Sequence, residues 1–279
     1  MNGFLLVNKP KGISSNHIVQ KIKKLLSAKK VGHLGTLDPL ATGLLIIAIN
    51  RATKFSSFFL ESDKKYDVQI ELGKSTDTDD LEGKVIFESN INPDREEIKK
   101  ALLSFKGNSM QVPPFFSALK YKGKPLYKYA RKGEYVKKEP RKITVHKIEN
   151  IVINNNICKF SISCSKGTYI RSIARDLGEK LRSGAHMIAL NRTKQQEFSI
   201  SDAIDIQDVT SRDLISIEAA FKNLDSISIS EENTKKFING NRLHLKHNEE
   251  DCIKVYDEYK NFLGLGKISN NHLKHKQLV

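Results

Sequence analysis

The stretch from Gly32 to Gly43, which reads Gly-His-Leu-Gly-Thr-Leu-Asp-Pro-Leu-Ala-Thr-Gly, most constrains the fold of this chain. Asp38 precedes a proline, which disfavours helical backbone at the aspartate and favours an extended one. Gly35 and Gly43 lie on either side and allow a tight turn or a close approach by other atoms. The apolar run 44–49 follows at once and has the length of a buried strand. The stretch therefore predicts one carboxylate on a rigid loop against a buried strand.

The charge pattern around Asp38 is one-sided. No Asp or Glu precedes it in the chain, whereas seven lysines do. The whole chain carries 47 Lys and Arg against 32 Asp and Glu, a formal net charge of +15. Such an excess favours a polyanionic partner, either nucleic acid or an anionic membrane surface. On this pattern alone Asp38 is either a functional carboxylate or part of an ordinary turn, because Asp-Pro commonly begins one.

The sequence favours neither a membrane protein nor a metalloprotein. The longest apolar run, 44–49, is much shorter than a membrane span. The apolar segment 4–7 is too short for the core of a signal peptide. The three cysteines, Cys158, Cys164 and Cys252, show neither metal-ligand nor disulfide spacing, which is typical of a reducing cytosol. We therefore predict a cytoplasmic protein that binds nucleic acid and has no metal site.

Apolar periodicity and turn residues predict an α+β fold. Strands are expected at 4–7, 44–49, 65–72, 84–88, 143–153 and 158–164. Helices are expected from Ser14 or Ser15 to Leu26, at 52–60, between Asp94 and Gly107, and from an N-cap at Thr168 to Leu181. The segment 201–226 is expected to be helical and polar. The acidic stretch 76–83 lacks the glycine of a calcium-binding loop and is predicted as a hairpin turn.

Two basic features point to an anionic partner. The stretch Lys120–Lys142 holds ten basic residues and four tyrosines, and cations neutralise phosphates while tyrosine rings stack on bases. The alternative is a solvated insertion with a tyrosine or two packed beneath it. Arg171 falls in the first turn of a predicted helix, where a cation opposes the helix dipole. Local stability does not explain this arginine, whereas an anionic partner would.

The glycine-rich stretch resembles the signature of the tRNA pseudouridine-55 synthases, read as Gly-His-x-Gly-x-Leu-Asp-Pro-x-Ala-x-Gly-x-Leu. Further segments agree with this family in order, namely Asn8–Ser15, Lys64–Tyr66 and Gly167–Arg171. The resemblance covers about residues 1–225 well and the remainder loosely. It implies a catalytic domain at 1–225 with a mixed or antiparallel sheet flanked by helices. Residues 226–279 are similar to a small β-barrel RNA-binding domain of the PUA type.

The resemblance also implies the chemistry and its residues. The family isomerises the T-loop uridine of tRNA to pseudouridine without a cofactor or metal. Asp38 is implied as the nucleophile, with either the uracil C6 or the ribose C1′ as the carbon attacked. Arg171 is implied as its cationic partner, and Tyr66 as the residue that stacks on the base and accepts or relays its C5 proton. The residues implied in substrate binding are His33, Tyr169, Leu190, Lys9 and Lys54.

Three hypotheses follow from the sequence. The first is a monomeric enzyme that acts on the T-arm of tRNA. The second is a tRNA-binding or tRNA-folding protein whose catalytic loop is vestigial, which the intact set of Asp38, Tyr66 and Arg171 disfavours. The third is the catalytic subunit of a guide-RNA particle, which the lack of a long basic extension disfavours. One departure from the family pattern is Asn191-Arg192, where paired arginines are common.

Overall fold

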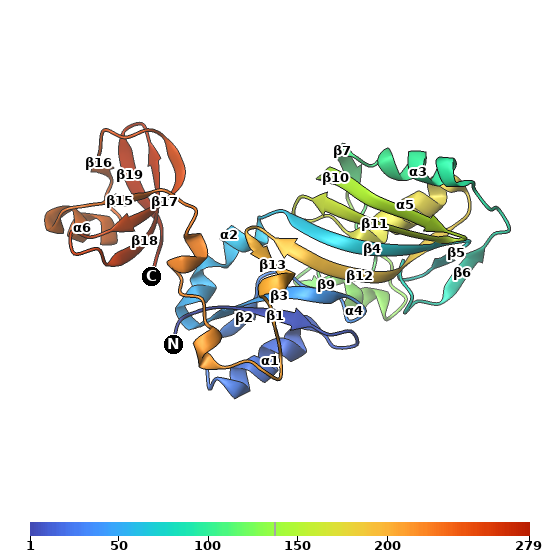
Figure 1. Ribbon diagram of the computed structural model, residues 1–279, viewed down its shortest axis with the longest axis horizontal. Helices are drawn as coiled ribbons and strands as arrows, with labels where there is room; N and C mark the ends of the chain where they lie inside the picture. Colours follow the sequence, from blue (N-terminus) through green and yellow to red (C-terminus); the bar gives the residue numbers. More distant parts are fainter. Residues whose placement is uncertain (137) are drawn as a thin grey trace.

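The computed structural model describes residues 1–136 and 138–279 of the chain. In this part a mixed sheet of ten strands runs along most of the molecule, and a five-stranded sheet forms a second body that contains the C-terminus (Figure 1). The predicted α+β class with a mixed sheet is thereby confirmed. Lys137 belongs to the basic stretch predicted to contact phosphates, and it lies outside the described residues.

Two largely antiparallel halves make up the larger sheet. Its strand order is β14-β1-β3-β12-β4-β11-β10-β7, with β2 paired to β3 and β13 to β12. The halves meet where β3 and β12 run parallel, through the pairs Thr42 with Asn191 and Gly43 with Arg192. The strands are β1 (Gly3–Lys9), β2 (Val31–His33), β3 (Thr42–Ile49), β4 (Lys64–Leu72), β7 (Gly107–Gln111), β10 (Arg141–Asn154), β11 (Ile157–Cys164), β12 (Ala185–Gln195), β13 (Phe198–Ser199) and β14 (Ile204–Asp205).

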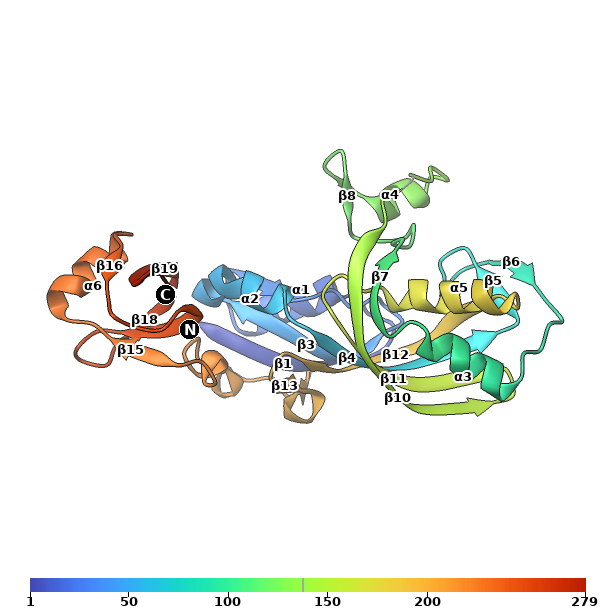
Figure 2. The same ribbon diagram turned by 90° about the horizontal axis from the view of Figure 1, so that it is seen from above.

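Helices cover one face of this sheet (Figure 2). Ile22 of the first helix packs in the same core as Leu5, and in the other half Leu177 packs in that core with Val68. Both helices are amphipathic, with their apolar residues recurring at helical spacing toward the sheet. The helices on this face are α1 (Ser15–Leu25), α3 (Arg95–Leu103) and α5 (Ile170–Leu181). The other helices lie elsewhere: α2 (Ser56–Leu60) on the opposite face, α4 (Leu126–Ala130) in a projecting arm and α6 (Glu231–Ile238) in the C-terminal body.

The strand β3 is apolar without alternation because both of its faces are covered. Leu45 and Ile47 lie in the core beneath α1. Leu44 and Ile46 lie in a second core on the opposite face, built from phenylalanines of α2 and of the 3₁₀ turn Asn50–Phe55. Burial on both faces turns the usual alternation of a strand into a continuous apolar run. The strand that follows the Asp38 loop is therefore a fixed support.

Two hairpins extend from the body of the large sheet. The strands β5 (Lys74–Thr76) and β6 (Val85–Glu88) pair antiparallel, which confirms the predicted hairpin turn. The strands β8 (Lys120–Tyr121) and β9 (Lys124–Pro125) pair likewise and, with α4, form an arm that projects from the helix-covered side (Figure 2). This arm carries the basic, tyrosine-rich stretch.

The C-terminal body is a curled half-barrel sheet in the order β15-β17-β18-β19-β16 (Figure 1). It contacts the larger body through Leu265, which shares a buried cluster with Phe55 and Phe221. The Tyr256 hydroxyl also donates to Glu218 over 2.8 Å. The strands are β15 (Ser226–Ser228), β16 (Leu243–His244), β17 (Glu250–Tyr256), β18 (Phe262–Ser269) and β19 (His272–Leu278).

Three local predictions were wrong. The helical spacing of Ile18, Ile22, Leu25 and Leu26 predicts that Leu25 lies on the buried side of α1, but it is 51% exposed because the helix ends there. Thr168 does not cap α5, because Tyr169 holds the N-cap position and the Thr168 hydroxyl donates to the Ser165 carbonyl. The segment 201–226 is not one helix and contains short 3₁₀ turns at Ile200–Asp202, Ser211–Asp213 and Ala219–Phe221. Its Ser, Thr and Asp side chains bond to nearby backbone amides, which competes with helix formation.

Candidate active site

The Asp38 loop connects β2 to β3 and is fixed by hydrogen bonds on both sides of the aspartate. The Ser15 hydroxyl accepts from the Leu37 amide and donates to the Leu37 carbonyl, each over 2.8 Å. The Gly12 amide donates to the Pro39 carbonyl over 2.8 Å. These bonds join the loop to the start of α1 and to the turn after β1. The carboxylate therefore has a fixed position, as the motif predicted.

Lys9 lies beneath this loop, not on its surface. Its side chain is fully buried, and its ammonium donates to the carbonyls of Ala41 (2.7 Å), Pro10 (2.9 Å) and Pro39 (3.3 Å). Burial lowers the pKa of Lys9 to about 8, an effect that the nearby Asp38 opposes. This geometry supports a bracing role for Lys9 and leaves its ammonium no open path to a substrate.

Asp38 faces Arg171 of α5. The Asp38 Oδ2 and Arg171 Nη2 atoms are 3.0 Å apart, and the arginine side chain is only 7% exposed. The aspartate side chain is 36% exposed, and this part faces a cavity rather than the outer surface. Loss of water raises the pKa of Asp38, while the Arg171 charge lowers it. The two residues that the sequence singled out are thus brought together as an ion pair.

A second carboxylate, that of Asp80, holds the same guanidinium from behind. Its Oδ2 lies 3.5 Å from Arg171 Nη1, and its side chain is 5% exposed. Arg171 also donates to the carbonyls of Thr78 (3.2 Å) and Phe116 (2.8 Å). The arginine is therefore held by four groups from three segments of the chain. Asp80 reinforces the raised pKa of Asp38 by like-charge repulsion.

Two cavities open on either side of the Asp38–Arg171 pair. The first encloses about 330 Å³, and the side chains that line it include Tyr66, Tyr169, Leu190 and Arg192. The second encloses about 590 Å³, and His33, Tyr127 and Arg131 are among its lining residues. A planar base fits the chemistry of the first cavity, because apolar and aromatic side chains surround a few polar groups. The second lies between the arm and the loop.

Tyr66 and Arg192 are neighbours across adjacent strands at the first cavity. Their backbones pair directly between β4 and β12. Burial raises the pKa of Tyr66 to about 12, and the Arg192 charge and its hydrogen bond to Tyr66 lower it. Arg192 is 1% exposed, and its Nε and Nη2 donate to the carbonyls of Leu44 (2.7 Å) and Gly35 (3.0 Å).

The two loop glycines are explained by the same arginine. A side chain at Gly35 would begin 3.1 Å from Arg192 Nη1, and at Gly43 only 2.4 Å from the Arg192 carbonyl. Both glycines also have positive φ angles, +138° and +101°. The close approach that these positions were predicted to allow is to Arg192.

Of the other predicted site residues, three line one of the two cavities and one does not. Leu190 and Tyr169 line the first cavity, and Gln111 bonds both the amide (2.9 Å) and the carbonyl (3.1 Å) of Tyr169. His33 lines the second cavity, and its Nδ1 is buried with no hydrogen-bond partner among the described residues. Lys54 is exposed on the 3₁₀ turn Asn50–Phe55 and lines neither cavity.

Sequence reasoning missed two functional candidates, Asp80 and Arg192. Asp80 was assigned only to a hairpin turn, although the cluster Thr-Asp-Thr-Asp-Asp was a signal for a polar site. Arg192 was noted only as a departure from the family pattern. Both reach the site through contacts between segments far apart in the chain, which local patterns do not reveal.

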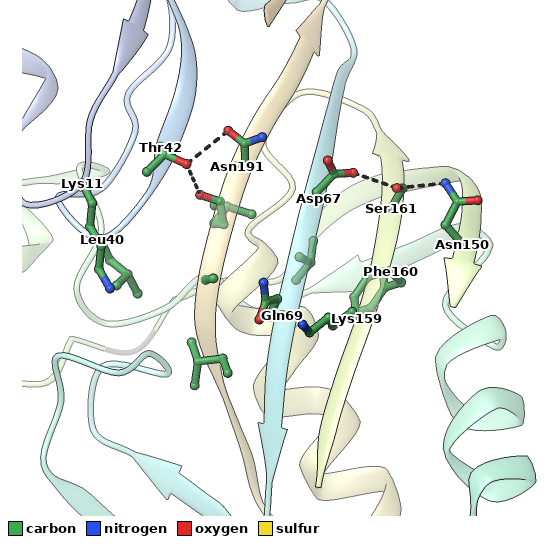
Figure 3. Close-up of a pocket in the computed structure, with 14 residues that line it drawn as sticks. Lys11, Leu40, Thr42, Asp67, Gln69, Asn150, Lys159, Phe160, Ser161 and Asn191 are labelled. Carbon is green, nitrogen blue, oxygen red and sulfur yellow. Dashed lines mark hydrogen bonds between the residues drawn. The ribbon is translucent and has the colours of Figure 1, made fainter. Parts of the chain in front are cut away.

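A third hollow, of about 500 Å³, lies on the opposite face of the sheet (Figure 3). Asp67 and Gln69 alternate with Tyr66 along β4 and so point away from Asp38. Ser161 links Asp67 (2.7 Å) to Asn150 (3.3 Å) across its floor. This hollow takes no part in the arrangement around Asp38.

The described residues hold neither a metal-ligand cluster nor a helix that could span a membrane. No group of three or more His, Cys, Asp or Glu side chains in 1–136 and 138–279 is placed to hold a metal ion. None of the helices in the same residues is both long and apolar enough to cross a membrane.

Comparison with known families assigns the chain. Residues 23–170 match the model described as "TruB family pseudouridylate synthase (N terminal domain)". Residues 171–227 match "tRNA pseudouridylate synthase B C-terminal domain", and 226–279 match "Pseudouridine synthase II TruB, C-terminal". The chain belongs to the TruB family of pseudouridylate synthases. It is therefore an isomerase that rearranges uridine to pseudouridine, which confirms the family and the activity predicted from the motif.

Similar proteins cover this TruB-family chain from end to end. The tRNA pseudouridine synthase B of Actinobacillus pleuropneumoniae is 40% identical over 98% of this chain and 94% of its own length. That of Aquifex aeolicus is 38% identical over 100% of both chains. A chain from an H/ACA RNP bound to a substrate RNA has the same fold, with a TM-score of 0.72 at 22% identity, over 99% of this chain and 84% of that one.

Proposed function

We propose that this chain converts uridine 55 in the T-loop of tRNA to pseudouridine, with Asp38 as the nucleophile. The relatives that are similar over the full length are tRNA pseudouridine synthases. The observation that carries the proposal is the Asp38–Arg171 ion pair at the mouth of a cavity lined by Tyr66 and Leu190. The reaction breaks the bond from C1′ to N1, turns the uracil and joins C5 to C1′.

Asp38 supplies the negative charge for this reaction. Arg171 keeps the carboxylate ionised against the loss of water and orients it with a charge-assisted hydrogen bond. The bracing of the loop by Lys9 and Ser15 limits its movement. A carboxylate that is fixed and ionised before the substrate arrives needs little reorganisation in the transition state.

Each of the two cavities binds a different part of the substrate. The base of the target nucleotide occupies the first cavity, stacked on Tyr66 and enclosed by Tyr169 and Leu190. Flipping this nucleotide out of the T-loop costs a few kcal/mol of stacking. His33 contacts the opened loop from the second cavity through its unpartnered Nδ1.

Basic surfaces offset this cost by binding phosphates. The arm formed by β8, β9 and α4 carries Lys120, Lys122 and Lys124, all exposed. We assign residues 1–225 to catalysis and 226–279 to RNA binding through a PUA-like domain. The proposed partner is the T-arm of tRNA, bound by one copy of the chain in the cytoplasm. Lys54 is retained only as a distant phosphate contact.

The test is turnover on a bare tRNA transcript by the purified chain. Pseudouridine is read by carbodiimide labelling and primer extension, with a transcript that carries cytidine 55 as the matched control. Conversion of uridine 55 alone, without other protein or RNA, supports the proposal. No conversion with tight tRNA binding would favour a tRNA-folding protein. Conversion that requires a guide RNA would favour the subunit of a guide-RNA particle.

A further inference from the structure

Arg192 is a buried arginine with no acidic partner in the part of the chain that the structure describes. It is the largest of the fully buried side chains, and the charges that act on it include no carboxylate. Its hydrogen bonds to Leu44 and Gly35 go to neutral carbonyl oxygens. Burying a cation without an anion is costly, and such charges are normally paired or lost. Arginine cannot lose its charge within a protein, so the unpaired buried charge lowers the stability of the folded state.

Bracing of the loop does not by itself explain this charge. Gln195 lies three residues after Arg192 on β12 and makes the same kind of contacts with a neutral amide. Its Nε2 donates to the carbonyls of Leu34 (2.7 Å) and Phe59 (3.0 Å). A glutamine thus suffices to hold two carbonyls at this depth. Tyr66 is the cross-strand neighbour of Arg192 and lines the same cavity. A cation at position 192 can stabilise negative charge on the Tyr66 phenol, whereas a neutral glutamine cannot.

We propose that Arg192 is the positioning residue for Tyr66, holding the phenol oxygen toward the base and favouring its phenolate form. The inference rests on the proposed role of Tyr66 as acceptor of the C5 proton. Nε and Nη2 are fixed by the carbonyls of Leu44 and Gly35, and the same guanidinium hydrogen-bonds the Tyr66 phenol. A cation fixed in this way needs no rearrangement when negative charge develops on the phenol oxygen.

The proton transfer that Arg192 supports begins after the detached uracil has turned and joined C5 to C1′. The C5–H bond then breaks, and its proton goes to the phenolate oxygen of Tyr66. The electron pair of that bond forms the C5–C6 double bond, and the electrons of the former N1–C6 double bond move to N1. N1 takes a proton from water, and the phenol returns its proton to water. Arg192 is 1% exposed and acts on this step through the Tyr66 phenol.

The first test reads the acidity of the phenol itself. Tyr66 is replaced by 3-fluorotyrosine, and its fluorine resonance is titrated in the folded protein with and without Arg192→Gln. Loss of the cation should raise the pKa of this phenol, because the cation lowers it in the parent protein. Arg192→Lys keeps the charge and should leave that pKa nearly unchanged. Gln195→Met removes only the neighbouring braces and should also leave it unchanged.

The sign of the shift separates the proposal from a purely structural role. If Arg192 only held the loop in place, its loss would admit water and lower the pKa of the phenol, since burial is what raises it. A lowered or unchanged pKa in Arg192→Gln therefore overturns the proposal. If Arg192→Gln does not fold, Arg192→Lys decides, because a large shift with the charge retained contradicts the charge-based account.

The second test is a double-mutant cycle on single-turnover rates. Arg192→Gln should slow pseudouridine formation by about 10–100-fold, less than the roughly 10²–10⁴-fold of general acid–base catalysis itself, because Tyr66 is retained. Its Kd for tRNA should change by less than about threefold. In a Tyr66→Phe background the same substitution should change the remaining rate by less than about threefold. An undiminished loss in that background overturns the proposal, whereas a wild-type rate in Tyr66→Phe alone refutes the role of Tyr66.

Discussion

Replacement of Arg171 by alanine should damage both stability and rate, and the two effects can be separated. The side chain is 7% exposed and is held by Asp38 at 3.0 Å and Asp80 at 3.5 Å. Removing one partner of a buried ion pair costs about 3–5 kcal/mol, because the remaining charge is left unpaired. Asp80 is the buried partner, whereas the part of the cost due to the more exposed Asp38 is screened. We expect a loss of about 3 kcal/mol, which lowers the Tm by about 6–12 °C.

The rate should be lost unevenly with pH. Burial raises the pKa of Asp38 and Arg171 lowers it, so removal of Arg171 raises this pKa further. A protonated carboxylic acid is not a nucleophile, so the rate of the variant falls as the pH falls and recovers as it rises. Single-turnover rates should be reduced at least about tenfold more at pH 6 than at pH 8.5, which corresponds to about 1.4 kcal/mol. Arg171→Lys should rescue part of the rate, because it restores the charge without the two-pronged geometry.

The assay is pseudouridine formation with enzyme in excess over a tRNA transcript, at several pH values below the Tm of each variant. Arg175→Ala is the matched control, because Arg175 lies one turn along α5 and pairs with Asp79 at 3.4 Å rather than with Asp38. The same fold-loss for Arg171→Ala at every pH would refute the charge-pair account. Asp80→Asn in the Arg171→Ala background should restore stability but not rate.

The remaining predictions concern metal independence, phosphate contacts and the brace under the loop. Activity on a pre-folded T-arm should survive EDTA, and a loss that only a transition metal restores would reveal a missed site. Replacing Lys120, Lys122 and Lys124 by glutamine should flatten the plot of log K against log salt by up to about one unit per lysine that contacts a phosphate. An unchanged slope would mean a merely solvated arm. Lys9→Met should lower the free energy of unfolding by about 2–4 kcal/mol through three lost carbonyl bonds, measured by urea titration. A loss below about 0.5 kcal/mol would contradict the bracing role.

The strands of the large sheet were predictable because their patterns are local. The continuous apolar run 44–49 indicates burial on both faces of the sheet, and it forms β3. The alternation at 65–72 indicates burial on one face, and it forms β4. The segment 201–226 was misassigned because its polar residues suit helices and turns alike. In the structure the side chains of Ser199 and Thr210 cap the first turns of short 3₁₀ helices, so this part of the chain forms short turns and not one long helix.

The site was only partly predictable from the sequence. Asp38 and Arg171 could be paired because the resemblance assigns them together, and neither spacing nor periodicity would have done so. Asp80 and Arg192 reach the site through contacts across 91 and 157 positions of sequence, counted from Arg171 to Asp80 and from Arg192 to Gly35. The position of Lys9 could not be predicted from the sequence. The resemblance implied a substrate contact for this lysine, whereas its three carbonyl partners support a bracing role.

The central claim is that Asp38 acts as the nucleophile while the rest of the chain binds tRNA. The direct measurement compares single-turnover pseudouridine formation and tRNA affinity for the parent chain and Asp38→Asn. The amide keeps the size of the side chain and can still bond near Arg171, but it carries no charge. The account predicts no detectable product, with a Kd within about tenfold of the parent, or about 1.4 kcal/mol. A residual rate above about one hundredth of the parent rate, a barrier change of less than about 2.7 kcal/mol, would contradict it.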